Sequence, residues 1–374
     1  MTGSSTAPKE LKTRILVVDD SPIFRNYWKK LIAGQEDIEA VGIGDNGQVA
    51  LDKSKLLLPD IIIIDLEMPV MDGLTAIPLL MKERPELKII VASSLTTAGS
   101  DRAVEALSRG AADYLAKPQA MDPNVSLDAV KAEILRKIRA LAPRRKAPVK
   151  NSTQTAAPAA KPSPTPIRTT ASHSGGGISA IAIGSSTGGP NALEKVLNAI
   201  PAHITQPIFI TQHMPKFFIT ALAQRMTKVS GRPCVEPATG DTIKDGHIYI
   251  APGDVHLVFK KNGTSIEAVL SDAPAENWCR PAVDPMFRSL ADIYGKNLLA
   301  VILTGMGEDG TLGAKDIAQK GGQIIAQDEA TSVVWGMPGA IAKAGLASKI
   351  LPIDQIGPWI WDRVGVKAEL LHHG

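Results

Sequence analysis

Short apolar runs alternate with segments whose apolar residues recur at helical spacing through most of the chain. In the first part of the chain, the runs at 14–20 and 59–69 predict buried parallel strands. Helix-spaced segments, such as 49–58 and 130–141, separate the runs. This alternation predicts an α/β domain in which a parallel sheet has helices on both faces and binds ligands at the carboxyl ends of its strands.

The same alternation resumes near residue 178 and predicts a second doubly wound parallel sheet. Buried strands are expected at 181–184, 208–211 and 298–303. Alternating apolar residues between 248 and 259 predict an added antiparallel hairpin region. The fold class is therefore α/β, with folded domains expected at 13–142 and 178–368.

Residues 143–177 differ in composition from both domains. They are rich in Pro, Ala, Thr and Ser, carry six Lys or Arg and no acids, and end in three glycines. Such a segment cannot bury enough apolar surface to fold alone, so a flexible linker is expected.

Charge and composition exclude several classes of protein. All of the excess positive charge lies in the linker, because residues 1–142 carry 18 basic against 20 acidic side chains and residues 178–374 carry 17 against 18, which leaves a net charge of +3 for the chain. Neither domain has the basic excess of a nucleic-acid-binding domain. No run approaches the about 18 apolar residues of a membrane helix, and the N-terminus lacks the apolar core of a signal peptide. Cys234 and Cys279 are too far apart for a paired-cysteine motif, so reduced thiols without zinc are expected. These features predict a cytoplasmic protein that is not inserted in a membrane.

Acidic residues end two of the predicted strands in the first domain. Asp19 and Asp20 follow one run and Asp65 ends another, so three carboxylates should meet at one edge of the sheet. They would repel one another without a divalent cation, and oxygen ligands with several waters suit Mg²⁺. Ser93 and Lys117 close two further runs and could hold a phosphoryl group on Asp65. Helix capping explains any one of these acids, but five suitable residues at strand ends predict a phospho-acceptor site.

Several motifs make the first domain resemble the receiver domains of bacterial two-component systems: VVDD at 17–20, DLEMPxMDG at 65–73, Ser93 and Lys117-Pro118. The resemblance implies a (βα)5 flavodoxin-like fold, and phosphoryl transfer to Asp65 from a histidine kinase of the CheA type. It also implies the remaining roles at the site: Mg²⁺ binding by Asp19, Asp20, Asp65 and the backbone carbonyl of Glu67, phosphoryl binding by Ser93 and Lys117, and a switch aromatic at Tyr114. Pro78 departs from the helical pattern, so the third helix should either start late or bend.

The segment IAIGSSTGGP at 181–190 predicts a buried strand that delivers hydroxyls to the start of a helix. His213 and Asp309 each follow a later predicted strand. If the three strands are parallel neighbours, a hydroxyl, an imidazole and a carboxylate converge, as nucleophilic catalysis requires. A lone Ser, His or Asp is usually structural, and His256 is the one other histidine expected near this edge. The three strand ends together predict a hydrolase, although position alone does not choose among Ser185, Ser186 and Thr187.

The second domain resembles the catalytic domain of chemotaxis methylesterases, the CheB family. The matching motifs are IGxSTGG at 183–189, QHMP at 212–215, APGDxHL at 251–257, RPxVD at 280–284, TGMGxDG at 304–310 and GMP at 336–338. The resemblance implies that Ser186 is the nucleophile, His213 the base and Asp309 the orienting acid, with Thr187 and Met306 at oxyanion or substrate contacts. Ala282 stands where the family usually has serine.

By the same resemblance, the expected reaction is hydrolysis of glutamate γ-methyl esters on methyl-accepting chemoreceptors, with deamidation of specific receptor glutamines. The catalytic domain needs no cofactor for this reaction, and a monomer is expected. The unphosphorylated receiver is expected to block the catalytic cleft. Two other functions are less consistent with the sequence. A transcriptional regulator would need a DNA-binding motif, and a nucleotide-binding domain would need GxGxxG spacing that GSSTGG lacks.

Overall fold

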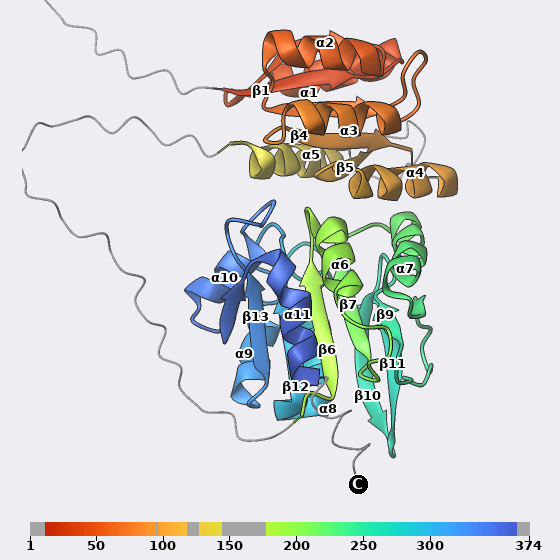
Figure 1. Ribbon diagram of the computed structural model, residues 1–374, viewed down its shortest axis with the longest axis vertical. Coiled ribbons are helices and arrows are strands. Elements are labelled where there is room, and N and C mark those ends of the chain that lie inside the picture. Colours follow the sequence, from red (N-terminus) through yellow and green to blue (C-terminus); the bar gives the residue numbers. More distant parts are fainter. Residues whose placement is uncertain (1–11, 95, 118–126, 144–176, 365–374) are drawn as a thin grey trace, which may run out of the picture.

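The computed structural model describes residues 12–94, 96–117, 127–143 and 177–364 of the 374-residue chain. The expected linker lies outside the described residues except at its two ends, as do Pro118 and the last four residues of the expected second domain. The described residues form two α/β units, one above the other in Figure 1.

The first unit is built on a parallel five-stranded sheet in the order β2-β1-β3-β4-β5. Its central strand, β3, is a run of four buried isoleucines ending in Asp65, as expected for a strand covered on both faces. The strands are β1 (Thr13–Val18), β2 (Ile38–Gly44), β3 (Ile61–Asp65), β4 (Lys88–Ser93) and β5 (Asp113–Ala116).

Five helices connect or follow these strands. They are α1 (Pro22–Ala33), α2 (Gly47–Leu57), α3 (Gly73–Glu83), α4 (Thr97–Ser108) and α5 (Leu127–Leu141). Helix α3 does not start late: it begins at Gly73 and continues through Pro78. A proline at this position cannot donate to the carbonyl of Leu74, four residues earlier. The guanidinium of Arg109 donates to that carbonyl instead, at 3.0 Å.

The second unit contains a parallel seven-stranded sheet in the order β14-β13-β12-β6-β7-β9-β8. A separate antiparallel hairpin confirms that the second unit has a hairpin region, but β10 and β11 form it at 256–271, whereas the strand at 248–250 joins the parallel sheet. Strand β6 lies between β12 and β7, so the three strands that Ser186, His213 and Asp309 follow are neighbours, as predicted. The strands are β6 (Ala180–Ser185), β7 (Ile208–Gln212), β8 (Cys234–Val235), β9 (Ile248–Ile250), β10 (His256–Asn262), β11 (Ser265–Ser271), β12 (Leu298–Ile302), β13 (Gln323–Gln327) and β14 (Lys349–Leu351).

Helices cover the larger sheet and bury its apolar strands. They are α6 (Gly189–Asn198), α7 (Lys216–Ser230), α8 (Val283–Tyr294), the 3-10 turn η1 (Gly295–Asn297), α9 (Thr311–Gln319), α10 (Met337–Lys343) and α11 (Ile353–Val364). Helix α6 begins directly after residue 188, with Pro190 in its first turn, where a proline suits a helix start. Strand β6 thus delivers its last residues to a helix start.

The first unit lies over the end of the second unit from which α6 and α7 begin, with α4 next to α7 (Figure 1). The ring of Tyr114 stacks on that of Phe218 in α7, with 4.3 Å between their centroids. The side-chain amide of Asn191 donates to the carbonyl of Ala111 at 3.2 Å. The two units therefore contact each other directly at the carboxyl-end edge of the larger sheet.

Candidate active site

Ser186 is the hydroxyl that the strand-to-helix turn leaves available. The Ser185 hydroxyl is fully buried and donates to the side-chain carbonyl of Gln212 at 2.7 Å, which ties β6 to β7. The Gln212 amide in turn donates to the backbone carbonyl of Ser186 at 2.9 Å. Ser186 is partly exposed, and among the described residues its hydroxyl has no hydrogen-bond partner. Ser185 is thus a packing residue, and Ser186 faces the cleft.

His213 and Asp309 meet at this edge of the sheet. His213 follows β7, and Asp309 lies in the loop between β12 and α9. The His213 Nε2 is 2.7 Å from the Asp309 Oδ2. The other ring nitrogen, Nδ1, lies 3.4 Å from the Sγ of Cys279. Burial alone lowers the pKa of His213, but the hydrogen bonds to Asp309 and Cys279 outweigh burial and raise that pKa to about 10.

The Asp309 carboxylate is fixed at the amino-terminal end of α8. Burial alone raises the pKa of Asp309, but its hydrogen bonds hold that pKa below the usual value. The shortest hydrogen bond to this carboxylate comes from the backbone N–H of Val283, at 2.6 Å. The other donors are the backbone N–H groups of Asp284 and Gly310 and the side-chain amide of Asn277. Asp309 is therefore an ionised carboxylate that can orient an imidazole.

A second buried carboxylate, Asp284, lies beside Asp309, although the sequence predicts no role for it. The Asn277 amide donates to both carboxylates at 3.0 Å. Burial and the neighbouring Asp309 raise the pKa of Asp284 to about 6. Asp284 also accepts from the backbone N–H of Gly313 at 2.7 Å. The RPxVD motif contains Asp284, so the signal was present, but nothing in the sequence placed it beside Asp309.

A cleft of about 950 Å³ lies between the two units. Ser186, His213 and Asp309 line it together with Thr187 and Met306. The first unit contributes the rest of one wall, through Asp113, Tyr114, Glu133, Arg136 and Lys137.

Asp113 makes the most direct contact between the units. Its Oδ2 accepts a hydrogen bond of 2.7 Å from the hydroxyl of Thr187, the residue next to Ser186. The Lys137 ammonium donates to the Asp113 Oδ1 at 3.2 Å and to the Tyr114 carbonyl at 2.9 Å. Lys137 also lies over the Tyr114 ring, 4.1 Å from its centroid. The buried Lys137–Asp113 ion pair of the first unit thus holds the carboxylate that accepts the Thr187 hydrogen bond.

The predicted phospho-acceptor residues also come together. The Lys117 ammonium lies 2.8 Å from the Asp65 Oδ2 and 2.9 Å from the Asp19 Oδ2. Burial raises the pKa of Asp65, with a further contribution from the charge of Asp19, and the contacts to Lys117 only partly offset these effects. Ser93 is buried at the end of β4, where its hydroxyl donates to the carbonyl of Gly99 at 2.8 Å.

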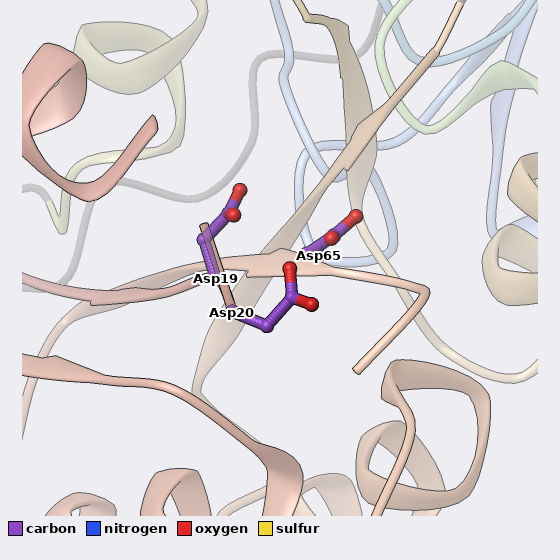
Figure 2. Close-up of side chains that lie close together, drawn as sticks. All are labelled: Asp19, Asp20 and Asp65. Atoms are coloured by element: carbon purple, nitrogen blue, oxygen red, sulfur yellow. The ribbon is translucent and has the colours of Figure 1, made fainter. Parts of the chain in front are cut away.

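Asp19, Asp20 and Asp65 form an acidic cluster that could bind a metal ion. Figure 2 shows the three carboxylates close together at the ends of β1 and β3. One oxygen from each lies within 4.8 Å of the others. Oxygen ligands of this kind fit a hard divalent cation. The Glu67 side chain is exposed and points to Arg102, at 3.8 Å, so it is not part of the cluster.

Comparison with known proteins identifies the family. One family model, the response regulator receiver domain, matches residues 15–127, and another, CheB methylesterase, matches residues 181–360. A protein-glutamate methylesterase/protein-glutamine glutaminase 1 of Paramagnetospirillum magneticum is 44% identical over an alignment covering 96% of this chain and 98% of that protein. The chain belongs to the CheB methylesterase family.

Two further matches are a curated relative and a solved structure. A protein-glutamate methylesterase/protein-glutamine glutaminase of group 2 operon from Rhodospirillum centenum is 45% identical, with 93% of each chain covered. The crystal structure of the Thermotoga maritima CheB methylesterase catalytic domain aligns with 50% of this chain and 98% of that chain, at 39% identity and a TM-score of 0.49. The match to the methylesterase model favours a hydrolase over the transcriptional or nucleotide-binding alternatives.

His256, the other histidine expected near this edge, has a structural role in this CheB family member. His256 is buried; its Nε2 contacts the Pro274 carbonyl at 3.1 Å, and its Nδ1 accepts from the backbone N–H of Ala282 at 3.1 Å. It therefore holds the ends of the 274–282 loop, which carries Asn277 and Cys279.

No helix in the described part of the chain is long and apolar enough to cross a membrane.

Proposed function

We propose that this chain hydrolyses glutamate γ-methyl esters of chemoreceptors and deamidates specific receptor glutamines, and so serves adaptation in chemotaxis. The observation that carries the proposal is the 2.7 Å contact between His213 and Asp309 in the cleft that Ser186 lines. Relatives that match over nearly the full chain are named for the same two activities.

In the proposed mechanism, the Ser186 hydroxyl attacks the γ-carbonyl while His213 accepts its proton. Because the His213 Nε2 is bonded to Asp309, the nitrogen that accepts the serine proton is Nδ1. The Asp309 carboxylate holds the ring and stabilises the imidazolium that forms. The proton then passes to the leaving group, which departs as methanol from an ester or ammonia from an amide. Water, activated by the same imidazole, releases glutamate from the acyl-enzyme.

The developing oxyanion needs hydrogen-bond donors near Ser186. We assign this role to backbone N–H groups of the turn after β6 and of the 305–307 loop, which includes Met306. Gly305 supports this placement, because a Cβ there would lie 2.9 Å from the Ser186 Cβ, so the loop passes very close to the nucleophile. A donor of this kind is typically worth about 2.7 to 4 kcal/mol in the transition state.

We further propose that the receiver inhibits the hydrolase until Asp65 is phosphorylated. Residues of β5 and α5 line one side of the cleft, and the Asp113 carboxylate accepts the hydrogen bond that the Thr187 hydroxyl donates. Tyr114, the proposed switch aromatic, is buried against Phe218 of α7. Rearrangement around Tyr114 would therefore move Asp113, its neighbour, away from Thr187.

The phosphoryl donor in this proposal is a histidine kinase of the CheA type. Asp19, Asp20 and Asp65, with the Glu67 backbone carbonyl, would hold Mg²⁺, which neutralises the carboxylates during transfer. Lys117 and Ser93 would bind the phosphoryl oxygens. To do so, Ser93 must give up its hydrogen bond to the Gly99 carbonyl. This exchange would link the phosphoryl group to the start of α4, which lies next to α7.

We propose a receiver at 13–142, a linker at 143–177 and a catalytic domain at 178–368, acting as a monomer in the cytoplasm. Methanol release from methylated receptor membranes, with and without acetyl phosphate, tests the reaction and its control together. We expect release to increase with acetyl phosphate and to disappear in Ser186→Ala, while Asp65 phosphorylation in that variant is unchanged. Methanol release by phosphorylated Ser186→Ala at the wild-type rate would refute the assigned nucleophile.

A further inference from the structure

Cys279 is held in a tight turn at the edge of the cleft. Glu276 and Cys279 pair through their backbones, at 2.8 and 3.2 Å, and enclose Asn277 and Trp278, both with positive φ. The Arg288 guanidinium anchors Glu276, while the Asn277 amide is bonded to Asp309. The turn is thus anchored on both sides, and it fixes the Cys279 backbone beside the catalytic residues.

The Cys279 thiol contacts the His213 nitrogen that, in the proposed mechanism, accepts the proton of Ser186. The Sγ lies 3.4 Å from the His213 Nδ1, while the Asp309 carboxylate is bonded to Nε2. Thiol, imidazole and carboxylate therefore form a continuous chain, which is the arrangement that activates a cysteine nucleophile. The Ser186 hydroxyl makes no hydrogen bond within the described residues.

The two cysteines of the chain differ sharply in their surroundings. Cys279 is partly exposed and lines the cleft. Cys234 is buried in β8, and burial raises the pKa of its thiol to about 12. A reactive thiol needs access and a neighbouring group that takes its proton. Cys279 has both, and Cys234 provides a natural control within the same chain.

We propose that Cys279 is a reactive thiol that shares His213 with Ser186, and that its covalent modification by a small soft electrophile switches the hydrolase off. The inhibitory part of this proposal rests on the proposed esterase function. An adduct on Sγ would stand where the reacting ester must approach His213. The esterase would then lose both its base and part of its cleft.

Iodoacetamide is the probe for this site. In the reaction, His213 Nδ1 takes the thiol proton, the sulfur forms a bond to the methylene carbon, and the carbon–iodine bond breaks to release iodide. The full-length protein is treated over a time course, and alkylation of each cysteine is measured by mass spectrometry. Methanol release from methylated receptor membranes is measured on the same samples after addition of acetyl phosphate.

We expect Cys279 to be alkylated at least about tenfold faster than Cys234, and His213→Gln to slow Cys279 alkylation about tenfold or more. During treatment with iodoacetamide, the Cys234→Ser variant should lose esterase activity as fast as the wild type does. Cys279→Ser and Cys279→Ala should each keep their own starting activity through the treatment. Two such variants are used so that a folding defect in one does not decide the result.

Equal alkylation rates for the two cysteines, or a Cys279 rate that His213→Gln leaves unchanged, would overturn the reactive-thiol proposal. Full alkylation of Cys279 with unchanged methanol release would overturn the inhibitory part. The mass measurement does not depend on esterase activity. If the proposed function itself failed, methanol release would be absent from untreated protein, and the alkylation rates would still decide the status of Cys279.

Discussion

The Thr187 hydroxyl donates a 2.7 Å hydrogen bond to the carboxylate of Asp113, joining the residue after the proposed nucleophile to the first residue of β5. Asp113 precedes Tyr114, the proposed switch aromatic, and is paired with the buried Lys137. One carboxylate therefore connects the start of β5 in the receiver to the cleft that Ser186 lines. This contact makes the inhibition of the esterase testable at a single residue.

Asp113→Ala should raise methanol release in the absence of a phosphodonor. A hydrogen bond to a charged group contributes about 1.5 to 3 kcal/mol, so its loss should increase the open fraction by about tenfold or more. The rate of methanol release by Asp113→Ala should not exceed that of a variant lacking residues 1–142, in which the whole receiver is removed from the cleft. Asp128→Ala, which removes an exposed acid of α5, is the matched control and should behave as wild type. An Asp113→Ala basal rate equal to wild type would show that this contact does not restrain the enzyme.

Asp309→Asn should lower the kcat for ester hydrolysis by about four orders of magnitude, the typical cost of losing the orienting carboxylate of a triad. The fold should be retained, because the single amide oxygen can still accept from the backbone N–H groups of Asp284 and Gly310, which bond to Oδ1 in the wild type. Methanol release from the phosphorylated variant measures the loss. Retention of more than about a tenth of wild-type activity would remove Asp309 from the catalytic assignment.

The pH dependence of kcat/KM tests the same pair independently. Only the neutral imidazole can accept the Ser186 proton, so activity is present above the His213 pKa and lost as pH falls through it. That pKa is raised, with Asp309 as the largest raising influence, so the acidic limb of the wild-type profile should lie above pH 6.5. In Asp309→Asn the limb should move to lower pH. A wild-type limb at or below 6.5 would contradict the geometry described for His213.

Removal of divalent metal should uncouple the receiver without affecting the hydrolase. With EDTA present, acetyl phosphate should no longer stimulate methanol release, while the basal rate stays the same. The reason is that Asp19, Asp20 and Asp65 would repel one another and the incoming phosphoryl group without a cation. Asp20→Asn should weaken the stimulation, and Asp101→Asn, an exposed acid of α4, should not. Undiminished stimulation in EDTA would argue against a metal-dependent phosphorylation step.

The sequence predicted the sheets and most of the catalytic edge, because buried parallel strands are marked by continuous apolar runs and their carboxyl ends must meet. It could not distinguish Ser185 from Ser186 without the family motif, since the distinguishing contact is Gln212 on another strand. The contact between Asp113 and Thr187 was also missed, although Lys137, the partner of Asp113, lies in register with the apolar residues Ile134 and Leu141 of α5. A lysine there signals a buried partner, but its identity depends on how the helix packs.

The structure also resolves how α3 tolerates Pro78, and this has a measurable consequence. Arg109→Met should leave the Leu74 carbonyl without its donor and destabilise α3 by about 1 to 3 kcal/mol. Hydrogen exchange of the α3 amides in the full-length protein measures this local stability, with the exposed Lys82→Met as a control. In a Pro78→Ala background the backbone N–H gained at position 78 can donate to the Leu74 carbonyl, so Arg109→Met should cost less. Equal costs in both backgrounds would mean that Arg109 stabilises α3 by some route other than the carbonyl that the proline leaves free.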